Sequence, residues 1–478
     1  METSTGIKPK AAADKKVLID QTFRDSVATI NAQGKRNFIF PKKPKGRLYN
    51  QRTAVSLAFL ALFFTLPFIK VEGEPLFLFN IPEGKFILFG QIFWPQDFFI
   101  FAIGFLAFMV FIVVFTVVFG RVFCGWVCPQ TVFMEMVFRK IEYWIDGDAQ
   151  AQKRLKAMPW NGYKIRKRVA KIVVFYAISF LIANFFLAYI ISLDNVLIMV
   201  KEGITEHLVT FTSLIGFSTI FFLVYYWFRE QACLVVCPYG RLQGELLDKK
   251  TMVVAYDYMR GEPRGKLKKE PIDVSGGDCI DCLACVRVCP TGIDIRNGTQ
   301  LECVNCTACI DACDDIMTKI NKPLGLIRID SEENIAGGKK NRLSLRLIAY
   351  VLVLVALVGF LAFLIISRRD VDATVLRTTG QLFQVQPDGR ISNLYSIKLA
   401  NKTRKEISVS LKLENMEGEI QVIGNALMVP KEAYSQSMFF VKLAPSQLVN
   451  RKTKIKIGVY HKGKRLETDE TTFIGPRN

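Results

Sequence analysis

Five apolar stretches interrupt this chain, and each is close to the length of a membrane-spanning helix. A helix needs about 20 predominantly apolar residues to cross the core of a bilayer. The pattern therefore predicts a polytopic α-helical membrane protein with five spans, at Ala54–Ile69, Asp97–Phe119, Lys171–Leu193, Leu208–Phe228 and Leu345–Ile366. The first stretch follows a polar, basic segment, residues 1–53, and no small-residue cleavage site comes after it, so we interpret it as a retained span and not as a signal peptide.

The hydrophobic pattern changes to a period of two after Ile366. Apolar and polar residues alternate in four segments, Leu394–Leu399, Ile407–Leu413, Gln436–Leu443 and Thr453–Tyr460. Turn residues lie between such segments, at Pro387-Asp388-Gly389 and Lys462-Gly463. This predicts a C-terminal all-β sandwich of immunoglobulin-like architecture over residues 370–478. It contains no catalytic constellation, so we expect it to serve docking or structural support.

The distribution of charge favours a membrane over a nucleic-acid partner. The net charge is +20, but the basic residues lie beside apolar segments and form no separate basic domain. Lysine and arginine crowd residues 1–53 and 120–171, whereas residues 71–96 and 194–207 contain one lysine each. The positive-inside rule places the crowded segments in the cytoplasm. We therefore expect a bacterial inner-membrane protein with a cytoplasmic N-terminal arm and a periplasmic C-terminal domain.

Eight of the 12 cysteines form two consecutive runs with the spacing C-x2-C-x2-C-x3-C. This is the ligand pattern of a two-cluster bacterial ferredoxin, in which the fourth cysteine of each run binds the other cluster. Zinc and disulfides fit the pattern less well, because zinc prefers two separated pairs of ligands. The spacing predicts a cytoplasmic ferredoxin-like module with two 4Fe-4S clusters over residues 251–340. One cluster is held by Cys279, Cys282, Cys285 and Cys313, and the other by Cys303, Cys306, Cys309 and Cys289.

The two runs differ in the residue that follows them. Pro290 follows the first run, whereas Asp314 follows the second. Proline restricts the residue before it to extended conformations. We therefore expect the chain to turn differently at the end of the first run than at the end of the second. A pair of glycines, Gly337-Gly338, then predicts a hinge between this module and the fifth span, residues 345–366.

The four remaining cysteines mark an internal repeat. The second span runs into Arg121-Val-Phe-Cys124-Gly-Trp-Val-Cys128-Pro129, and the fourth runs into Arg229-Glu-Gln-Ala-Cys233-Leu-Val-Val-Cys237-Pro238. Duplicated spans that carry matching motifs suggest internal pseudo-symmetry, as in other membrane proteins built from repeats. We therefore expect a four-span unit over residues 54–250, with both motifs close together on the cytoplasmic side.

The C-x3-C-P motifs suggest a site for a soft metal. Two thiols four residues apart lie on one face of a helix, and the proline suits the first position of a new helix. Cys128 and Cys237 would then lie at helix N-termini, where the helix dipole stabilises a thiolate. Low-pKa thiolates favour Cu(I), bound by Cys124, Cys128, Cys233 and Cys237. The alternatives are a third iron–sulfur cluster, redox-active disulfides, or small buried side chains without chemistry.

Histidine is informative because it is scarce. The chain has two, His207 and His461, and they cannot pair within the spans as the ligands of a membrane haem would. The sequence therefore argues against a transmembrane haem pathway. We interpret His207, at the outer edge of the fourth span, as an interfacial residue.

The two C-x3-C-P motifs, the doubled ferredoxin run and the terminal sandwich, in this order, resemble the cytochrome c oxidase accessory protein family known as CcoG, FixG or RdxA. The basic approach to the first span, Pro41-Lys-Lys-Pro-Lys-Gly-Arg47, is also similar. The resemblance implies a cupric reductase, which reduces Cu(II) to Cu(I) during assembly of a cbb(3)-type haem–copper oxidase. It further implies that the cysteines from 279 to 313 bind clusters and that Cys124, Cys128, Cys233 and Cys237 handle copper.

The implied partners are copper chaperones and transporters, subunits or assembly factors of the oxidase, and an electron donor that the sequence does not identify. Two other functions fit the same motifs. A membrane quinol dehydrogenase would pass electrons to a periplasmic reductase, and a non-catalytic copper chaperone or scaffold would bind metal without turnover. The terminal sandwich has no cofactor motif, which favours a role in assembly over a circuit that ends in a reductase.

Overall fold

The computed structural model describes most of the chain. The described residues are 29–30, 33, 35–82, 84–94, 97–266, 277–337, 345–368, 371–378, 382–403, 405–424, 427–431, 433–448 and 450–476. Most of the basic N-terminal arm and Gly338 of the expected hinge lie outside them. The chain divides into two compact units. One comprises Met1–Thr65, Phe108–Leu187 and Val196–Leu354, and the other comprises Leu66–Ala107, Ala188–Asn195 and Val355–Asn478.

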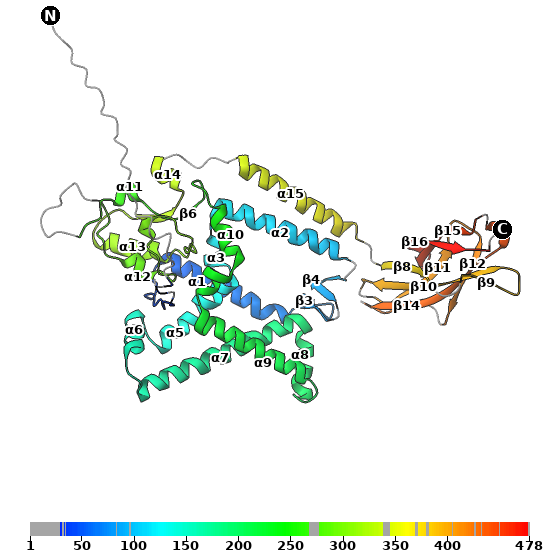
Figure 1. Ribbon diagram of the computed structural model, residues 1–478, viewed down its shortest axis with the longest axis horizontal. Coiled ribbons are helices and arrows are strands. Elements are labelled where there is room, and N and C mark those ends of the chain that lie inside the picture. The colour runs from blue at the N-terminus through cyan, green and yellow to red at the C-terminus, as the bar shows by residue number, and fades with distance from the viewer. Residues whose placement is uncertain are drawn as a thin grey trace, which may run out of the picture. The chain divides into compact units, whose positions relative to one another are not determined.

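Five helices within the described residues are long and apolar enough to cross a membrane (Figure 1). They are Arg47–Phe68, Phe98–Phe119, Gly162–Ile191, Leu208–Phe228 and Leu345–Ile366. The five predicted spans are therefore confirmed as helices. The first and third begin earlier than predicted, because polar and basic residues continue each helix beyond the apolar stretch that hydropathy detects.

Short helices connect the spans of the first unit. Its elements are α1 (Arg47–Thr65), α2 (Phe98–Phe119), α3 (Val122–Trp126), α4 (Pro129–Thr131), the π-helix η4 (Val132–Phe138), α5 (Arg139–Ile145), α6 (Ala149–Ala157), α7 (Gly162–Ile191), α8 (Leu193–Glu202), α9 (Leu208–Leu223), the π-helices η5 (Val224–Phe228) and η6 (Ala232–Val236), and α10 (Pro238–Leu246). Their core is aromatic. Phe138 of η4 stacks on Tyr225 of η5, with ring centroids 4.6 Å apart, so the segment after the second span packs on the end of the fourth span.

The cysteine runs lie in a small module that follows α10. Strand β6 (Val253–Tyr256) pairs antiparallel with β7 (Ile327–Asp330), so the chain leaves the module beside the point where it entered. Between the strands lie α11 (Tyr258–Gly261), α12 (Ala284–Val288), the 3₁₀ helix η7 (Ile295–Asn297) and α13 (Ala308–Lys319); α14 (Glu332–Gly337) and α15 (Leu345–Ile366) follow. The core combines apolar side chains such as Val254 and Met317 with cysteines from both runs.

The second unit contains small sheets near its first residues. The 3₁₀ helix η2 (Leu66–Phe68), the hairpin of β1 (Lys70–Val71) and β2 (Glu74–Pro75), and a three-stranded antiparallel sheet of β3 (Phe77–Asn80), β4 (Lys85–Leu88) and β5 (Gln91–Phe93) follow one another. This sheet was not predicted from the sequence. Phe93 is buried in it, whereas Phe89 at the turn is exposed, so the aromatic residues serve both packing and surface.

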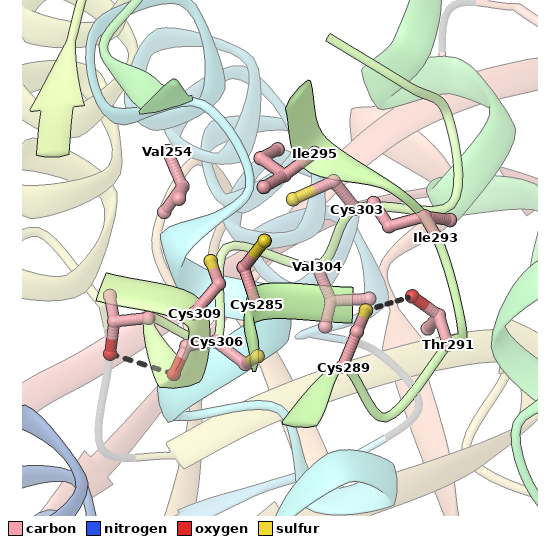
Figure 2. A pocket seen from close by; sticks show the side chains of 11 residues that line it. Val254, Cys285, Cys289, Thr291, Ile293, Ile295, Cys303, Val304, Cys306 and Cys309 are labelled. Carbon is pink, nitrogen blue, oxygen red and sulfur yellow. Dashed lines mark hydrogen bonds between the residues drawn. The ribbon is translucent and has the colours of Figure 1, made fainter. Parts of the chain in front are cut away.

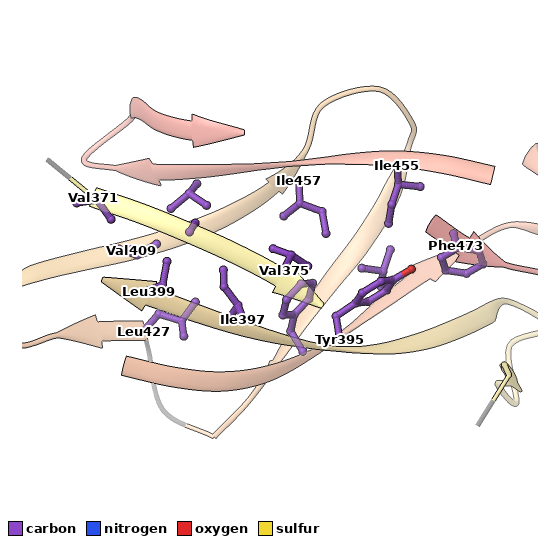
Figure 3. Packing of buried hydrophobic residues seen from close by; sticks show 14 of the residues in the cluster. Val371, Val375, Tyr395, Ile397, Leu399, Val409, Leu427, Ile455, Ile457 and Phe473 are labelled. Atoms are coloured by element: carbon purple, nitrogen blue, oxygen red, sulfur yellow. The ribbon is translucent and has the colours of Figure 1, made fainter. Parts of the chain in front are cut away.

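The C-terminal part of the second unit is the predicted all-β sandwich. One sheet has the strand order β12-β14-β10-β8, with β9 also paired to β10, and the other has the order β13-β11-β15-β16. The strands are β8 (Val371–Arg377), β9 (Gln384–Val385), β10 (Ile391–Asn401), β11 (Ile407–Leu413), β12 (Gly418–Ile423), β13 (Leu427–Val429), β14 (Tyr434–Leu443), β15 (Lys452–His461) and β16 (Lys464–Ile474). Alternate residues such as Tyr395, Ile397 and Leu399 are fully buried between the sheets (Figure 3).

Candidate metal centres

The two cysteine runs fold into nearly identical loops. In the first run, Asp281 and Leu283 have positive φ angles of 52° and 56°. In the second, Asn305 and Thr307 have φ angles of 52° and 64° at the same offsets from the first cysteine. Positive φ is uncommon for residues other than glycine, so its repetition reflects a requirement of the loop. Each loop turns twice before its helix, α12 or α13, begins.

The structure gathers the eight cysteines around two cavities, in the interleaved grouping that the spacing predicts. We call Cys289, Cys303, Cys306 and Cys309 the proximal set, and Cys279, Cys282, Cys285 and Cys313 the distal set. The proximal set lines one cavity, around which Figure 2 shows the sulfur atoms. The distal set lines a neighbouring cavity, and Cys285 touches both.

The donors in these cavities suit iron–sulfur clusters. Apolar side chains such as Val254, Ile293 and Val304 share the proximal cavity with the thiols. Burial raises the pKa of Cys303 to about 12, so a metal must displace the proton to bind there. Among the described residues, no three His, Cys, Asp or Glu side chains converge closely enough to hold a single metal ion. Four thiols to a cavity, in the interleaved ferredoxin spacing, suit a multi-iron cluster better than zinc, which draws its four ligands around one ion.

The ends of the two runs differ, as the sequence suggests. Helix α12 ends at Val288, and Cys289, before Pro290, is extended with φ −68° and ψ 123°. Helix α13 instead continues through Cys313 to Lys319. Proline excludes helical geometry for the residue before it, whereas Asp314 does not. The fourth cysteine of each run nevertheless reaches the cavity of the other run.

In both C-x3-C-P motifs the proline begins a new helix, as predicted, but the two cysteines of a motif do not lie in one helix. After α2, Cys124 lies in α3 and Cys128 is the N-cap of α4, with Pro129 at its first position. After η5, Cys233 lies in η6 and Cys237 is the N-cap of α10, which begins with proline. In each repeat a break in the helix therefore separates the two cysteines of the motif. The proline supplies the reason, because it fits the first helical turn and disfavours helix before it.

The two repeats hold each other through reciprocal arginine contacts. Arg121, before the first motif, donates to the carbonyl of Gly240 at 3.0 Å and to the amide oxygen of Gln243 at 3.2 Å, both on the helix after the second motif. Arg229, before the second motif, forms a two-pronged ion pair with Glu142, at 3.2 and 3.0 Å, in the chain that follows the first motif. Both arginines are buried. No role for either arginine follows from the sequence alone.

The thiols of the two motifs lie close enough to influence the pKa values of Cys124 and Cys233. Burial raises the pKa of Cys124 to about 11, and the nearby Arg121 opposes this while Cys128 and Cys237 add to it. Burial likewise raises the pKa of Cys233 to about 12. Desolvation therefore outweighs the favourable charges at these two thiols. Metal binding at these residues must displace protons.

The first motif packs directly on the proximal loop. Cys124 contacts a buried cluster that contains Val304, Cys306 and Ala308. A β-carbon added to Gly125 would lie 2.4 Å from the carbonyl oxygen of Val304, so the two backbones are as close as a glycine allows. The Cys124 thiol also donates to Gln243 at 2.9 Å. These contacts join the membrane-edge thiols to the proximal set, a link that no spacing in the sequence indicates.

Three family models match separate parts of the chain. Residues 101–147 match a "4Fe-4S binding domain", residues 228–332 match a "4Fe-4S dicluster domain", and residues 361–476 match the "IG-like fold at C-terminal of FixG, putative oxidoreductase". The first of these matches includes Cys124 and Cys128.

Curated relatives match over most of their length. The nitrogen fixation protein FixG of Rhizobium meliloti is 34% identical over 435 residues, which cover 82% of each chain. The protein RdxB of Cereibacter sphaeroides is 34% identical over 78% of this chain and 81% of its own. RdxA of the same organism is 33% identical over 80% of this chain and 83% of its own. The chain belongs to the FixG/RdxA family.

Membership of the FixG/RdxA family agrees with the fold and the donors. The chain is an iron–sulfur protein with five helices that can cross a membrane, 4Fe-4S domains and a C-terminal immunoglobulin-like sandwich. A crystal structure of a FixG-related protein from Vibrio parahaemolyticus also matches, at 20% identity and a TM-score of 0.19, over 22% of this chain and 97% of that one.

Proposed function

We propose that this protein transfers single electrons through two 4Fe-4S clusters to copper, and reduces Cu(II) to Cu(I) at Cys124, Cys128, Cys233 and Cys237. The observation that carries this proposal is the packing of Cys124 against Val304 and Cys306 of the proximal loop. This packing puts thiols, which are soft metal ligands, beside the proximal set, where a one-electron carrier would bind.

The reaction balances with one external reductant. When bound, the clusters supply a relay for single electrons. The donor loses one electron for each Cu(II), and that electron converts Cu(II) to Cu(I). Thiolates prefer Cu(I) to Cu(II), so their binding favours the reduced product. Two thiolates suffice for a linear Cu(I) site, which fits the absence of three convergent donors among the described residues.

We place this activity in the assembly of a cbb(3)-type oxidase in a bacterial inner membrane. The charge asymmetry of the loops supports a cytoplasmic N-terminus and cluster module and a periplasmic sandwich. Copper chaperones or transporters would then exchange copper with the protein, and oxidase subunits or assembly factors would receive it. The sandwich carries no described candidate metal site, which supports a docking role for it.

A pair of cysteine variants tests the relay. Replacing Cys282 in the distal set or Cys306 in the proximal set by serine should remove the visible absorbance of the cluster at that set and abolish cupric reduction under a Cu(I) chelator. The assay uses the full-length protein, purified without oxygen and reduced chemically. Cupric reduction that survives both substitutions would eliminate the relay.

A second variant tests the copper site. The double change Cys124→Ala with Cys233→Ala should leave iron and sulfide contents unchanged, while Cu(I) affinity and cupric reduction fall. An unchanged Cu(I) affinity would move the copper site elsewhere. Loss of iron equivalent to one cluster would show that these cysteines ligate a third cluster. Cluster reduction by quinol with no cupric reduction would favour the quinol dehydrogenase.

A further inference from the structure

The two cysteine loops differ in exposure at one matched position. Leu283 and Thr307 stand four residues after the first cysteine of their runs, and each lines the cavity of its own run. Leu283 is 43% exposed, whereas Thr307 is 1% exposed. Every other described residue that lines either cavity is at least partly buried. Leu283 therefore marks the point where the lining of a cavity reaches the surface, and this point belongs to the distal set.

The proximal loop is covered by other parts of the same unit. Asn305 is 2% exposed, and a β-carbon at Gly125 would lie 2.9 Å from its carbonyl oxygen. A β-carbon at Gly292 would likewise lie 2.7 Å from the side chain of Ile39, in the chain that leads to the first span. Electron transfer slows steeply with distance, so a protein that supplies electrons gains its shortest path at the distal set.

Basic residues lie directly beside the exposed distal loop. Arg287 of α12 donates through Nη2 to the carbonyl of Cys282 at 2.8 Å. The carbonyl of Arg287 accepts the backbone N–H of Lys42, also at 2.8 Å. Lys42 belongs to residues 41–47, which we call the basic strap. The strap therefore starts next to the loop that carries Leu283.

The basic strap is positively charged and has no acidic residue. Its four exposed basic side chains are Lys42, Lys43, Lys45 and Arg47. Lys140 of α5 adds to this charge: burial lowers its pKa, and the positive charges of Lys43 and Arg52 lower it further. Among the residues that the structure describes, no ion pair joins a carboxylate to the strap, to Lys140 or to Arg287.

The carboxylates near this surface are engaged elsewhere. Asp281 pairs with Arg296 at 2.6 Å, and Asp278 pairs with both Arg260 and Lys322. Two others accept backbone N–H groups. They are Asp148, which accepts from Lys43 at 2.9 Å, and the buried Asp311, which accepts from Leu48 and Tyr49. The basic side chains of the strap, Lys140 and Arg287 outnumber these last two carboxylates, so the surface keeps a net positive charge.

The position of the strap favours a protein partner over lipid. The apolar part of the first span starts at Ala54, seven residues after Arg47, which is about 10 Å along a helix. The headgroup layer on each side of a bilayer is about 5–8 Å thick. The strap continues from Arg47 onto the cluster module, where Lys42 is bonded to Arg287. Its basic side chains therefore start beyond the headgroups.

We propose that the basic strap and Arg287 form the docking surface for an acidic one-electron carrier protein, which delivers electrons at the distal set beside Leu283. Complementary charge speeds the encounter of two proteins and orients them. One electron passes from the reduced carrier to the cluster held at the distal set, and no bond forms or breaks. The inference rests on the two clusters of the proposed function and names the class of the external reductant.

The test measures reduction of the full-length protein in detergent, without copper, by a reduced plant-type 2Fe–2S ferredoxin, which is an acidic one-electron carrier. Lys42→Glu with Lys45→Glu reverses two exposed charges of the basic strap. The rate constant of cluster reduction at low ionic strength should fall at least tenfold, and the dissociation constant of the oxidised ferredoxin should rise by a similar factor. Iron and sulfide contents should not change. Added salt should slow reduction of the unaltered protein and narrow the difference.

Two further variants and a second reductant keep the test decisive. Lys452→Glu with Lys456→Glu is the matched control, because it changes the net charge equally at exposed lysines of β15 in the sandwich. It should leave the ferredoxin rate unchanged, whereas Arg287→Gln should lower it. Methyl viologen, a small cationic reductant, should reduce the strap variant at least as fast as the unaltered protein, because it does not need a basic docking surface.

Equal ferredoxin rates and affinities in the strap variant and the unaltered protein would overturn the proposal, as would an equal loss in the sandwich control. Loss of bound phosphatidylglycerol from the strap variant with an unchanged ferredoxin rate would assign the strap to anionic lipid and overturn it as well. Protein without iron and sulfide would refute the relay of the proposed function and this inference with it. Because no copper is present, failure of the docking surface alone leaves cupric reduction to be judged separately.

Discussion

Gly125 lies against the carbonyl oxygen of Val304 so closely that a β-carbon on the glycine would stand 2.4 Å from that oxygen. Gly125 separates Cys124 from the rest of its motif, and Val304 lies between Cys303 and Cys306 of the proximal set. Two segments with candidate metal ligands, about 180 residues apart in sequence, therefore meet backbone to backbone. The distance between the first C-x3-C-P motif and the proximal loop therefore depends on the absence of a side chain at Gly125.

Gly125→Ala should slow electron transfer from the clusters to copper without removing the clusters. A methyl group must push the motif away from the proximal loop, and electron transfer slows steeply as the separation between carriers grows. We expect unchanged iron and sulfide contents and a severalfold slower reoxidation of the reduced protein by Cu(II), followed by stopped-flow absorbance. Gly216→Ala is the control, because nothing lies within 4 Å of a β-carbon at Gly216. Equal reoxidation rates for the two variants would show that the contact of Gly125 with Val304 does not set the distance between the clusters and copper.

Local patterns predicted much of this fold. Apolar length alone identified the five spans, and alternation identified β10, β11, β14 and β15, because both signals lie within one element. The interleaved grouping of the eight cysteines followed from ligand spacing for the same reason. The sheet of β3, β4 and β5 was missed because its strands are only three or four residues long, too short for a clear alternation of apolar and polar residues.

Tertiary relationships could not be predicted in the same way. Arg52 looks like one more basic residue at the cytoplasmic end of a span, and only the fold shows it buried, with its Nε on the carbonyl of Gly125. The raised pKa values of Cys124 and Cys233 also escape local patterns, because the burial of these thiols depends on how the repeats pack. The contact of Gly125 with Val304 likewise joins separate motifs.

Glu142→Gln should destabilise the protein strongly. Glu142 is 3% exposed, pairs with Arg229 through both oxygens and accepts from Lys171 at 2.5 Å. Removing one partner of a buried ion pair leaves the other charge uncompensated, which costs about 3–5 kcal/mol. We expect a clearly lower thermal midpoint in detergent. Lys319→Gln is the control, since its pair with Asp315 is exposed on both sides and such changes stay within about 0.5 kcal/mol. Similar midpoints for both variants would contradict a stabilising role for this pair.

The contribution of Glu142 should depend on pH only in strong acid. Burial alone would raise the pKa of Glu142, but Arg229 and Lys171 outweigh it and lower the pKa from 4.5 to about 2. A lowered pKa in the folded state gives stability that is present above pH 4.5 and is lost as the pH falls toward 2. The difference in midpoint between the unaltered protein and Glu142→Gln should therefore be constant from neutral pH to about pH 5 and shrink below it. A difference in midpoint that already shrinks near neutral pH would show that it does not come from the lowered pKa of Glu142.

Asp311 should stabilise the start of the first span from within the cluster module. Its carboxylate accepts the backbone N–H groups of Leu48 at 3.1 Å and Tyr49 at 2.7 Å, in the first turn of α1. A β-carbon at Gly46 would lie 2.3 Å from the Asp311 side chain, so that glycine permits the contact. Removing an N-terminal cap costs about 0.5–2 kcal/mol, and the loss of a negative charge at the positive end of the helix adds to it.

Asp311→Ala should accordingly lower the thermal midpoint and loosen the junction between α1 and α13, whereas Asp311→Asn, which keeps an acceptor, should cost less. Hydrogen exchange of the Leu48 and Tyr49 amides measures the junction directly, and their protection should fall in Asp311→Ala. Asp315→Ala is the matched control on the same helix, because the Asp315 side chain is 62% exposed and forms an exposed ion pair with Lys319. Loss of protection in Asp315→Ala, or full protection in Asp311→Ala, would show that the helix start is held by packing and not by this carboxylate.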